Sequence, residues 1–119
     1  MNFQDNLSAM PDISHLSGFD VLDAQGKILH HIHAVQGKLG SLKLYNALAQ
    51  EFDNRLDSAA AERGLSLFAE HTADARANPG KHPNIDLLFK VKNEGLKLRL
   101  RPLVADLRCR GRLKNGATF

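Results

Sequence analysis

The segment Leu96-Lys97-Leu98-Arg99-Leu100-Arg101 alternates a leucine with a cation throughout. Because successive side chains of a β-strand point to opposite faces of a sheet, this order puts three leucines on one face and three cations on the other. The segment therefore predicts a strand that packs one face on the core and turns the other to water, as antiparallel sheets do. Pro102 follows it, and since proline has no backbone N–H, we expect limited pairing beyond this residue.

A hairpin over 18–35 is expected to supply two further strands. Residues 18–23 alternate apolar and polar side chains, the next three residues contain a glycine and indicate a turn, and 27–35 follow as the second strand. His31 and His33 share one face of that strand, where two imidazoles can chelate a divalent ion. Because a third and a fourth ligand would have to come from elsewhere, we interpret the pair as part of a solvated face and predict no metal ligands.

Three segments carry the apolar spacing of amphipathic helices, over 41–52, over 58–76 and over 83–94, and a weaker helix is expected over 3–10. Gly64 lies in the middle of the second helix, where it indicates the close approach of another helix or a kink. The pattern predicts an α+β fold, in which a small antiparallel sheet is covered by about three helices.

The chain is long enough for one domain, and we expect that domain to span 1–104. Beyond it, 105–119 reads as a basic tail that includes the single cysteine, Cys109. Residues 96–119 hold seven of the sixteen Lys and Arg residues but one of the thirteen Asp and Glu residues. Such a basic end predicts either a solvated tail or an arm that binds nucleic acid.

No apolar run approaches the roughly 20 residues that span a bilayer, and the first residues do not resemble a signal peptide. A single cysteine also excludes a disulfide framework within the chain. We therefore predict a cytoplasmic protein that does not cross a membrane. Its oligomeric state and any cofactor stay open.

The densest group of polar and conformationally special residues lies at 71–86, where the second predicted helix ends and the third begins. Asn78-Pro79-Gly80 is expected to end one helix, and Pro83 to lie in the first turn of the next. We call 71–86 the corner. The predicted site residues are the side chains that this corner displays, namely His71, Asp74, Arg76, Lys81, His82, Asn84 and Asp86.

Several functions are compatible with the corner. The first hypothesis is a non-catalytic domain that binds a small anionic ligand or an acidic partner through the cations and the helix N-terminus. The alternative is a metal-dependent enzyme that uses His71, Asp74 and His82, although their spacing matches no known ligand signature. Caps and turns need the same residue types, so a purely structural corner also stays open. Nucleic-acid binding through the basic C-terminus ranks third among the functions.

A second candidate for anion binding precedes the helix at 41–52. Two glycines, Gly37 and Gly40, flank Lys38, and we expect Ser41 to be the N-cap. Backbone N–H groups, close approach and a positive charge are what an anion at a helix N-terminus requires. The spacing of a phosphate-binding P-loop is missing, and a simple turn into the helix explains the same glycines.

Residues 41–48, 64–76 and 78–86 carry a family resemblance. Their sequences, SLKLYNAL, GLSLFAEHTADAR and NPGKHPNID, resemble a bacterial family of small proteins known only as a domain of unknown function. The resemblance extends over most of 1–104. It implies a compact bacterial cytosolic protein and brings no activity and no functional residues with it.

Overall fold

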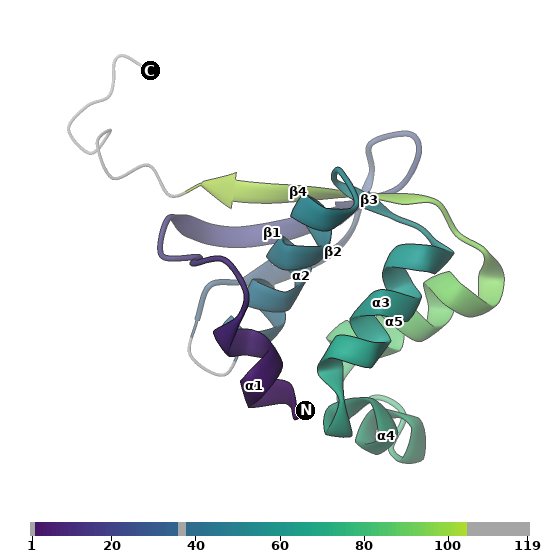
Figure 1. Ribbon diagram of the computed structural model, residues 1–119. Helices are drawn as coiled ribbons and strands as arrows, with labels where there is room; N and C mark the ends of the chain where they lie inside the picture. The colour runs from purple at the N-terminus through teal and green to yellow at the C-terminus, as the bar shows by residue number, and fades with distance from the viewer. Residues whose placement is uncertain (1, 36–37, 105–119) are drawn as a thin grey trace.

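The computed structural model describes residues 2–35 and 38–104, so the predicted basic tail with Cys109 lies outside the described residues. The elements in chain order are α1 (Phe3–Ser8), β1 (Leu16–Leu22), β2 (Ile28–His33), α2 (Leu39–Glu51), β3 (Arg55–Leu56), α3 (Ser58–Phe68), α4 (Glu70–Ala77), α5 (Pro83–Glu94) and β4 (Leu98–Val104). The strands form one antiparallel sheet in the order β2-β1-β4-β3. In Figure 1 the sheet runs along the top and the helices lie below it, so they cover one face. The predicted α+β class is confirmed.

The strands follow the predicted alternation, with one correction at the end of β4. Leu98 and Leu100 are buried among the helices, whereas the arginines beside them are exposed. Pro102 was expected to limit further pairing, but β4 pairs with β1 as far as Val104. On the other side of β4, the short strand β3 pairs with residues 98 and 99 alone. The missing N–H of the proline is therefore tolerated where β4 has one neighbouring strand.

The helix expected over 58–76 is two helices. Ala69 takes a left-handed φ of 54° between α3 and α4 and interrupts the run of helical hydrogen bonds. The Thr72 hydroxyl donates to the carbonyl of Leu65 at 2.5 Å, so it satisfies an acceptor that the end of α3 leaves open. This break lets α4 leave the direction of α3 and places the corner beside the N-terminal helix α1 (Figure 1).

The close approach predicted at Gly64 is confirmed. A Cβ atom at this position would lie 2.8 Å from a methyl of Leu88 and 2.9 Å from one of Leu48, so only glycine lets α3 pack this closely on α5 and α2. Gly95 ends α5 with a left-handed φ of 65°, which glycine adopts without steric cost. No helix within 2–35 and 38–104 has the length and apolar character needed to cross a membrane.

Candidate functional site

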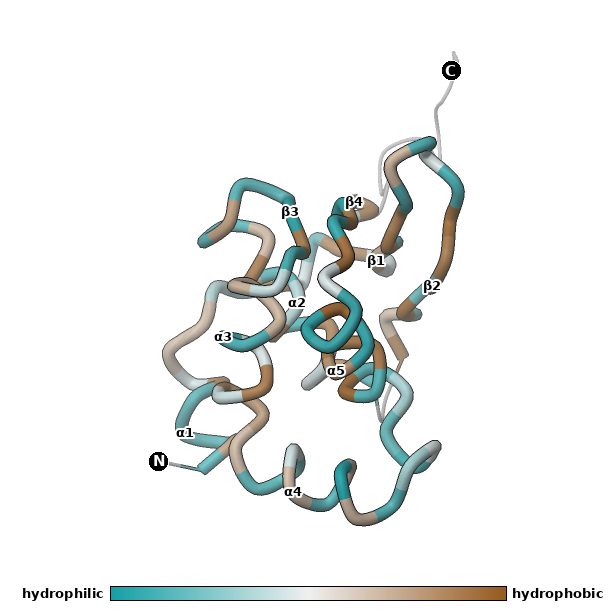
Figure 2. Tube along the Cα trace, turned by 90° about the vertical axis from the view of Figure 1, so that its right-hand side faces the viewer, coloured by the Kyte–Doolittle hydropathy of each residue, from teal (hydrophilic) through white to brown (hydrophobic). Residues whose placement is uncertain are grey.

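Asp74 is the centre of the polar contacts in the corner. Its Oδ2 atom accepts hydrogen bonds from Nε2 of His82 at 2.6 Å and from Nζ of Lys81 at 3.0 Å. Oδ1 accepts from the side-chain amide of Asn78 at 3.0 Å. The hydrogen bonds from His82 and Lys81 lower the pKa of Asp74 to about 2. One carboxylate thus joins the end of α4 to the loop that leads into α5, where polar residues recur along the chain (Figure 2).

His71 lies against α1. Its ring makes an edge-on contact with Phe3, with the ring centroids 4.9 Å apart, and its centroid is 5.9 Å from that of His82. The backbone N–H of Phe3 donates to Oε1 of Glu70 at 2.9 Å, and Asn6 donates to the carbonyl of Leu67 at 2.9 Å. These bonds hold α1 against α3 and α4, so His71 and His82 become neighbours beside an N-terminal helix.

Asn84 anchors the start of α5 to the rest of the fold. Its side-chain Oδ1 is 2.6 Å from Nε2 of His30 in β2, and its backbone carbonyl accepts from the hydroxyl of Tyr45 in α2 at 2.5 Å. Tyr45 is fully buried, and burial raises the pKa of its hydroxyl. The position of Asn84 is therefore determined by the sheet and by α2 together.

The two remaining predicted site residues point elsewhere. The guanidinium of Arg76 lies over the ring of Phe89, 5.1 Å from its centroid. Asp86 accepts from the backbone N–H of Gly80 at 2.9 Å and so stabilises the loop before α5. Neither residue lines the cavity described next.

A cavity of about 420 Å³ lies between α1, the N-terminus of α2 and the corner. We call it the corner cavity. Four predicted site residues line it together with the segment that starts α2, and apolar side chains form the remaining wall. The lining residues used below are His71, Lys81, His82 and Asn84 from the corner, Lys38, Gly40 and Ser41 from the start of α2, and Phe3, Leu7, Leu39, Phe68 and Ile85. The two anion-binding candidates of the sequence therefore face the same space.

The start of α2 differs from the prediction in one respect. The helix begins at Leu39, so Lys38 and not Ser41 is the N-cap residue, and no side chain caps its first turn. The expected N-cap is wrong because the helical hydrogen bonds already begin with Leu42 N–H donating to the carbonyl of Lys38 at 3.0 Å. The first N–H groups of a helix have no partner inside it, so this end carries a partial positive charge. That charge faces the corner cavity.

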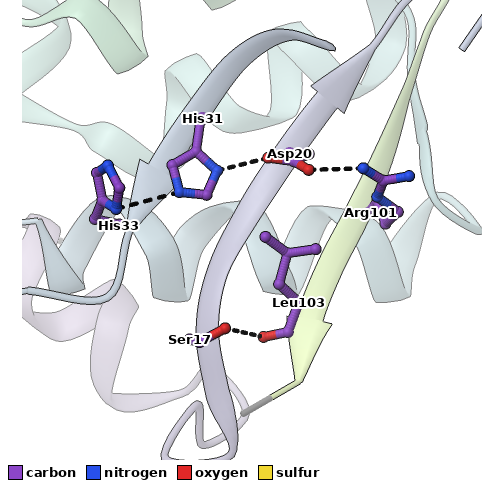
Figure 3. Close-up of polar contacts among 6 residues, drawn as sticks. All are labelled: Ser17, Asp20, His31, His33, Arg101 and Leu103. Carbon is purple, nitrogen blue, oxygen red and sulfur yellow. Dashed lines mark hydrogen bonds and ion pairs between the residues drawn. The ribbon is translucent and has the colours of Figure 1, made fainter. Parts of the chain in front are cut away.

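A second polar group, which the sequence did not predict, lies on the face of the sheet that the helices leave open. Asp20 in β1 is 4% exposed, and its carboxylate accepts from Nδ1 of His31 at 2.5 Å and from Arg101 at 2.8 Å. Nε2 of His31 is 3.2 Å from Nδ1 of His33 (Figure 3). Burial alone would raise the pKa of Asp20, but the hydrogen bonds from Arg101 and His31 outweigh it and lower the pKa below its ordinary value.

We call Asp20, His31, His33 and Arg101 the sheet cluster. A charged residue between the buried Phe19 and Val21 is the signal that could have indicated it, since a buried carboxylate requires partners. Within the described part of the chain, no three His, Cys, Asp or Glu side chains are grouped so that they could hold a metal ion.

The fold and the site define a small α+β domain with a cation-lined cavity at a helix corner. The chain belongs to a family described as an uncharacterized protein conserved in bacteria (DUF2322), whose model matches residues 3–102. The family resemblance is thereby confirmed over most of the described chain. Comparison with curated proteins and with solved structures gives no match.

Proposed function

We propose that this protein is a non-catalytic binding domain that holds a small organic anion in the corner cavity. The observation that carries the proposal is that two lysines, two histidines and the uncapped start of α2 line one cavity. Among the described lining residues none is acidic. A cavity with this lining favours a carboxylate or a phosphate group over a neutral or cationic ligand.

The cations of the cavity come from two elements that are far apart in the sequence. Lys38 starts α2, whereas Lys81 and His82 precede α5. Asp74 holds Lys81 and His82 through one carboxylate oxygen, which limits their motion before a ligand arrives. Binding to groups that are already ordered loses less conformational entropy, so this arrangement supports a specific site more than a general attraction for anions.

The apolar wall indicates the rest of the ligand. Phe3 and Phe68 stack with their ring centroids 5.3 Å apart, and Leu7, Leu39 and Ile85 complete the wall. Ligand cavities in proteins commonly hold roughly 300–1,000 Å³, so a volume of about 420 Å³ suits a small molecule. We therefore expect a ligand that combines one anionic group with a compact apolar body.

Thermal unfolding and calorimetry with inorganic phosphate, phenyl phosphate and benzoate test the proposal. Phenyl phosphate or benzoate should raise the melting temperature more than inorganic phosphate does, because ligands that bind only the native state stabilise it. Lys81→Ala should weaken binding about tenfold, the value expected for one charge-assisted hydrogen bond. Lys90→Ala is the matched control, since it removes the same charge from an exposed position on α5 outside the cavity.

Two results would count against the site. One is that none of the three anions changes the melting temperature. The other is that Lys90→Ala weakens binding as much as Lys81→Ala, which would indicate a general charge effect.

The metal-dependent enzyme ranks lower. His71 packs on Phe3, and Asp74 already bonds to His82 and Lys81, so their contacts give no support to a shared metal. We also propose that the protein is cytoplasmic, and this part of the proposal is supported by the sequence alone.

Nucleic-acid binding is the second candidate, and one observation favours it. Arg55 and Arg99 stand directly opposite each other in the register of β3 and β4. Like charges in such a pair repel, and a polyanion on this face would relieve the repulsion. A test is binding of labelled single-stranded RNA at two salt concentrations, in which Arg99→Ala should weaken binding and reduce its salt dependence. If Arg99→Ala binds the RNA as tightly as the original protein does, nucleic-acid binding through this face is excluded.

A further inference from the structure

His31 and His33 bring two ring nitrogens close together at the edge of the sheet. The His31 side chain is 33% exposed, His33 is exposed, and β2 is the outermost strand on its side. Nε2 of His31 lies 3.2 Å from Nδ1 of His33, and the two rings are inclined at 77° (Figure 3). The two nitrogens are thus close together without stacking of the rings.

Asp20 determines which nitrogen of His31 carries the lone pair. An ionised carboxylate can only accept hydrogen bonds, so Nδ1 of His31, 2.5 Å away, carries the hydrogen. In the neutral imidazole, Nε2 then carries the lone pair, and this atom is directed at His33. Metal-binding histidines are oriented in this way, with the second ring nitrogen donating to a carboxylate.

The carboxylate is itself held in place. Asp20 is almost fully buried, and Arg101 from the neighbouring strand donates to its other oxygen at 2.8 Å. Arg101 also supplies a positive charge that keeps the carboxylate ionised. The orientation of His31 therefore depends on three adjacent strands and not on a mobile loop.

Gly18 provides the space for the ring of His31. A Cβ atom at Gly18 would lie 3.1 Å from Cε1 of His31 and 3.4 Å from its Nε2, so the imidazole lies against the backbone of β1. The same Cβ atom would come within 2.8 Å of the carbonyl oxygen of Ile32. A side chain at this position would displace the ring.

The separation of the two nitrogens fits a shared metal ion. Zinc–nitrogen bonds of about 2.0–2.1 Å at a tetrahedral angle put two ligand nitrogens about 3.3–3.4 Å apart. We propose that His31 and His33 bind a divalent transition metal ion such as Zn²⁺ through Nε2 and Nδ1, with Asp20 as the positioning residue and water in the other positions. When the neutral His33 ring carries its hydrogen on Nε2, its Nδ1 atom also has a lone pair, and a small rotation of the exposed ring directs both lone pairs at one point.

This site has no residue in common with the corner cavity, so it goes beyond the proposed function and can be tested separately. It differs from the isolated histidine pair considered from the sequence because Asp20 and Arg101 come from other strands. The ligand is recognised by its preference for imidazole nitrogen, which Zn²⁺, Cu²⁺ and Ni²⁺ share.

The experiment is titration of the untagged protein with Zn²⁺, followed by calorimetry and by the ring signals of the histidines in NMR spectra. Zn²⁺ should shift the signals of His31 and His33, and His31→Ala or His33→Ala should abolish the binding. Asp20→Asn should weaken binding 10- to 100-fold, as loss of an orienting carboxylate does elsewhere. His15→Ala is the matched control, because it removes an exposed histidine that precedes β1.

The proposal is overturned if Zn²⁺ does not bind, or if it binds equally well to His33→Ala. Equal losses in His15→Ala and His33→Ala would also overturn it. Since Asp20 is buried, its variant is first checked for native circular dichroism. His33→Ala decides the question even if Asp20→Asn does not fold, because His33 is exposed and is not one of the buried core residues.

Discussion

Two aspartate–histidine pairs lie in different parts of this protein and differ in their surroundings. In the corner, Asp74 accepts from His82 at 2.6 Å and from Lys81, and 37% of its side chain is exposed. In the sheet cluster, Asp20 accepts from His31 at 2.5 Å and from Arg101, and its side chain is 6% exposed. The hydrogen-bond chemistry is therefore the same, while the access to water differs.

Burial decides what each pair contributes. An exposed ion pair is screened by water, so it orders its side chains and adds little to stability. A buried carboxylate leaves uncompensated donors when it is removed. The comparison indicates that Asp74 orders groups at a binding cavity, whereas Asp20 joins three strands and orients a ring.

The largest expected effect is that of Asp20→Ala. It removes the acceptor for His31 and Arg101, and we expect the free energy of unfolding to fall by about 2–3 kcal/mol. The estimate is below that for a fully buried pair because Arg101 is half exposed. Urea unfolding of Asp20→Ala and, separately, of Asp74→Ala measures how much each lowers the free energy of unfolding. A loss at Asp74 as large as that at Asp20 would contradict the comparison.

The pH dependence of stability at Asp74 is expected to be a smaller effect than that of Asp20→Ala, because water screens an exposed carboxylate. The pKa of Asp74 is about 2 in the native state, against roughly 3.9 in an unfolded chain. A lowered native pKa stabilises the fold above the unfolded value, and this contribution is lost as the pH falls from about 4 to about 2. Urea unfolding between pH 5 and pH 2 should therefore show a shallower decline for Asp74→Asn than for the original protein. Parallel curves would show that Asp74 has no such role.

The smallest expected effect is that of Arg76→Ala. Its contact with Phe89 is a cation–π contact at an exposed site, where such contacts contribute about 0.5–1 kcal/mol. Because Arg76 does not line the corner cavity, the affinity for phenyl phosphate should stay unchanged. A tenfold loss of this affinity, measured by calorimetry, would show instead that Arg76 contributes to the binding site.

The sequence predicted best what depends on neighbours in the chain. The alternation at 96–101 and the close approach at Gly64 were both evident from local patterns. Asp74 and His82 are eight positions apart, so the predicted corner contained both residues, although their contact was not predicted.

Features that depend on distant partners were missed. Nothing in the sequence marks Ala69 as a break, because alanine is the best helix former and its left-handed φ depends on packing. The two residues of β3 become a strand only because β4 lies beside them. Likewise, Asp20 and Arg101 are 81 positions apart and meet only in the folded sheet.

The central claim is that the corner and the start of α2 form one anion site. Amide chemical shifts, recorded by ¹⁵N–¹H NMR during titration with phenyl phosphate, test it most directly. We predict that the amide signals of Leu39 and Gly40 shift together with those of Lys81 and His82 and give one common affinity. The amide signals of β4 should not shift. Shifts that occur along β4 and leave the corner unchanged would contradict the claim and favour a polyanion on the open face of the sheet.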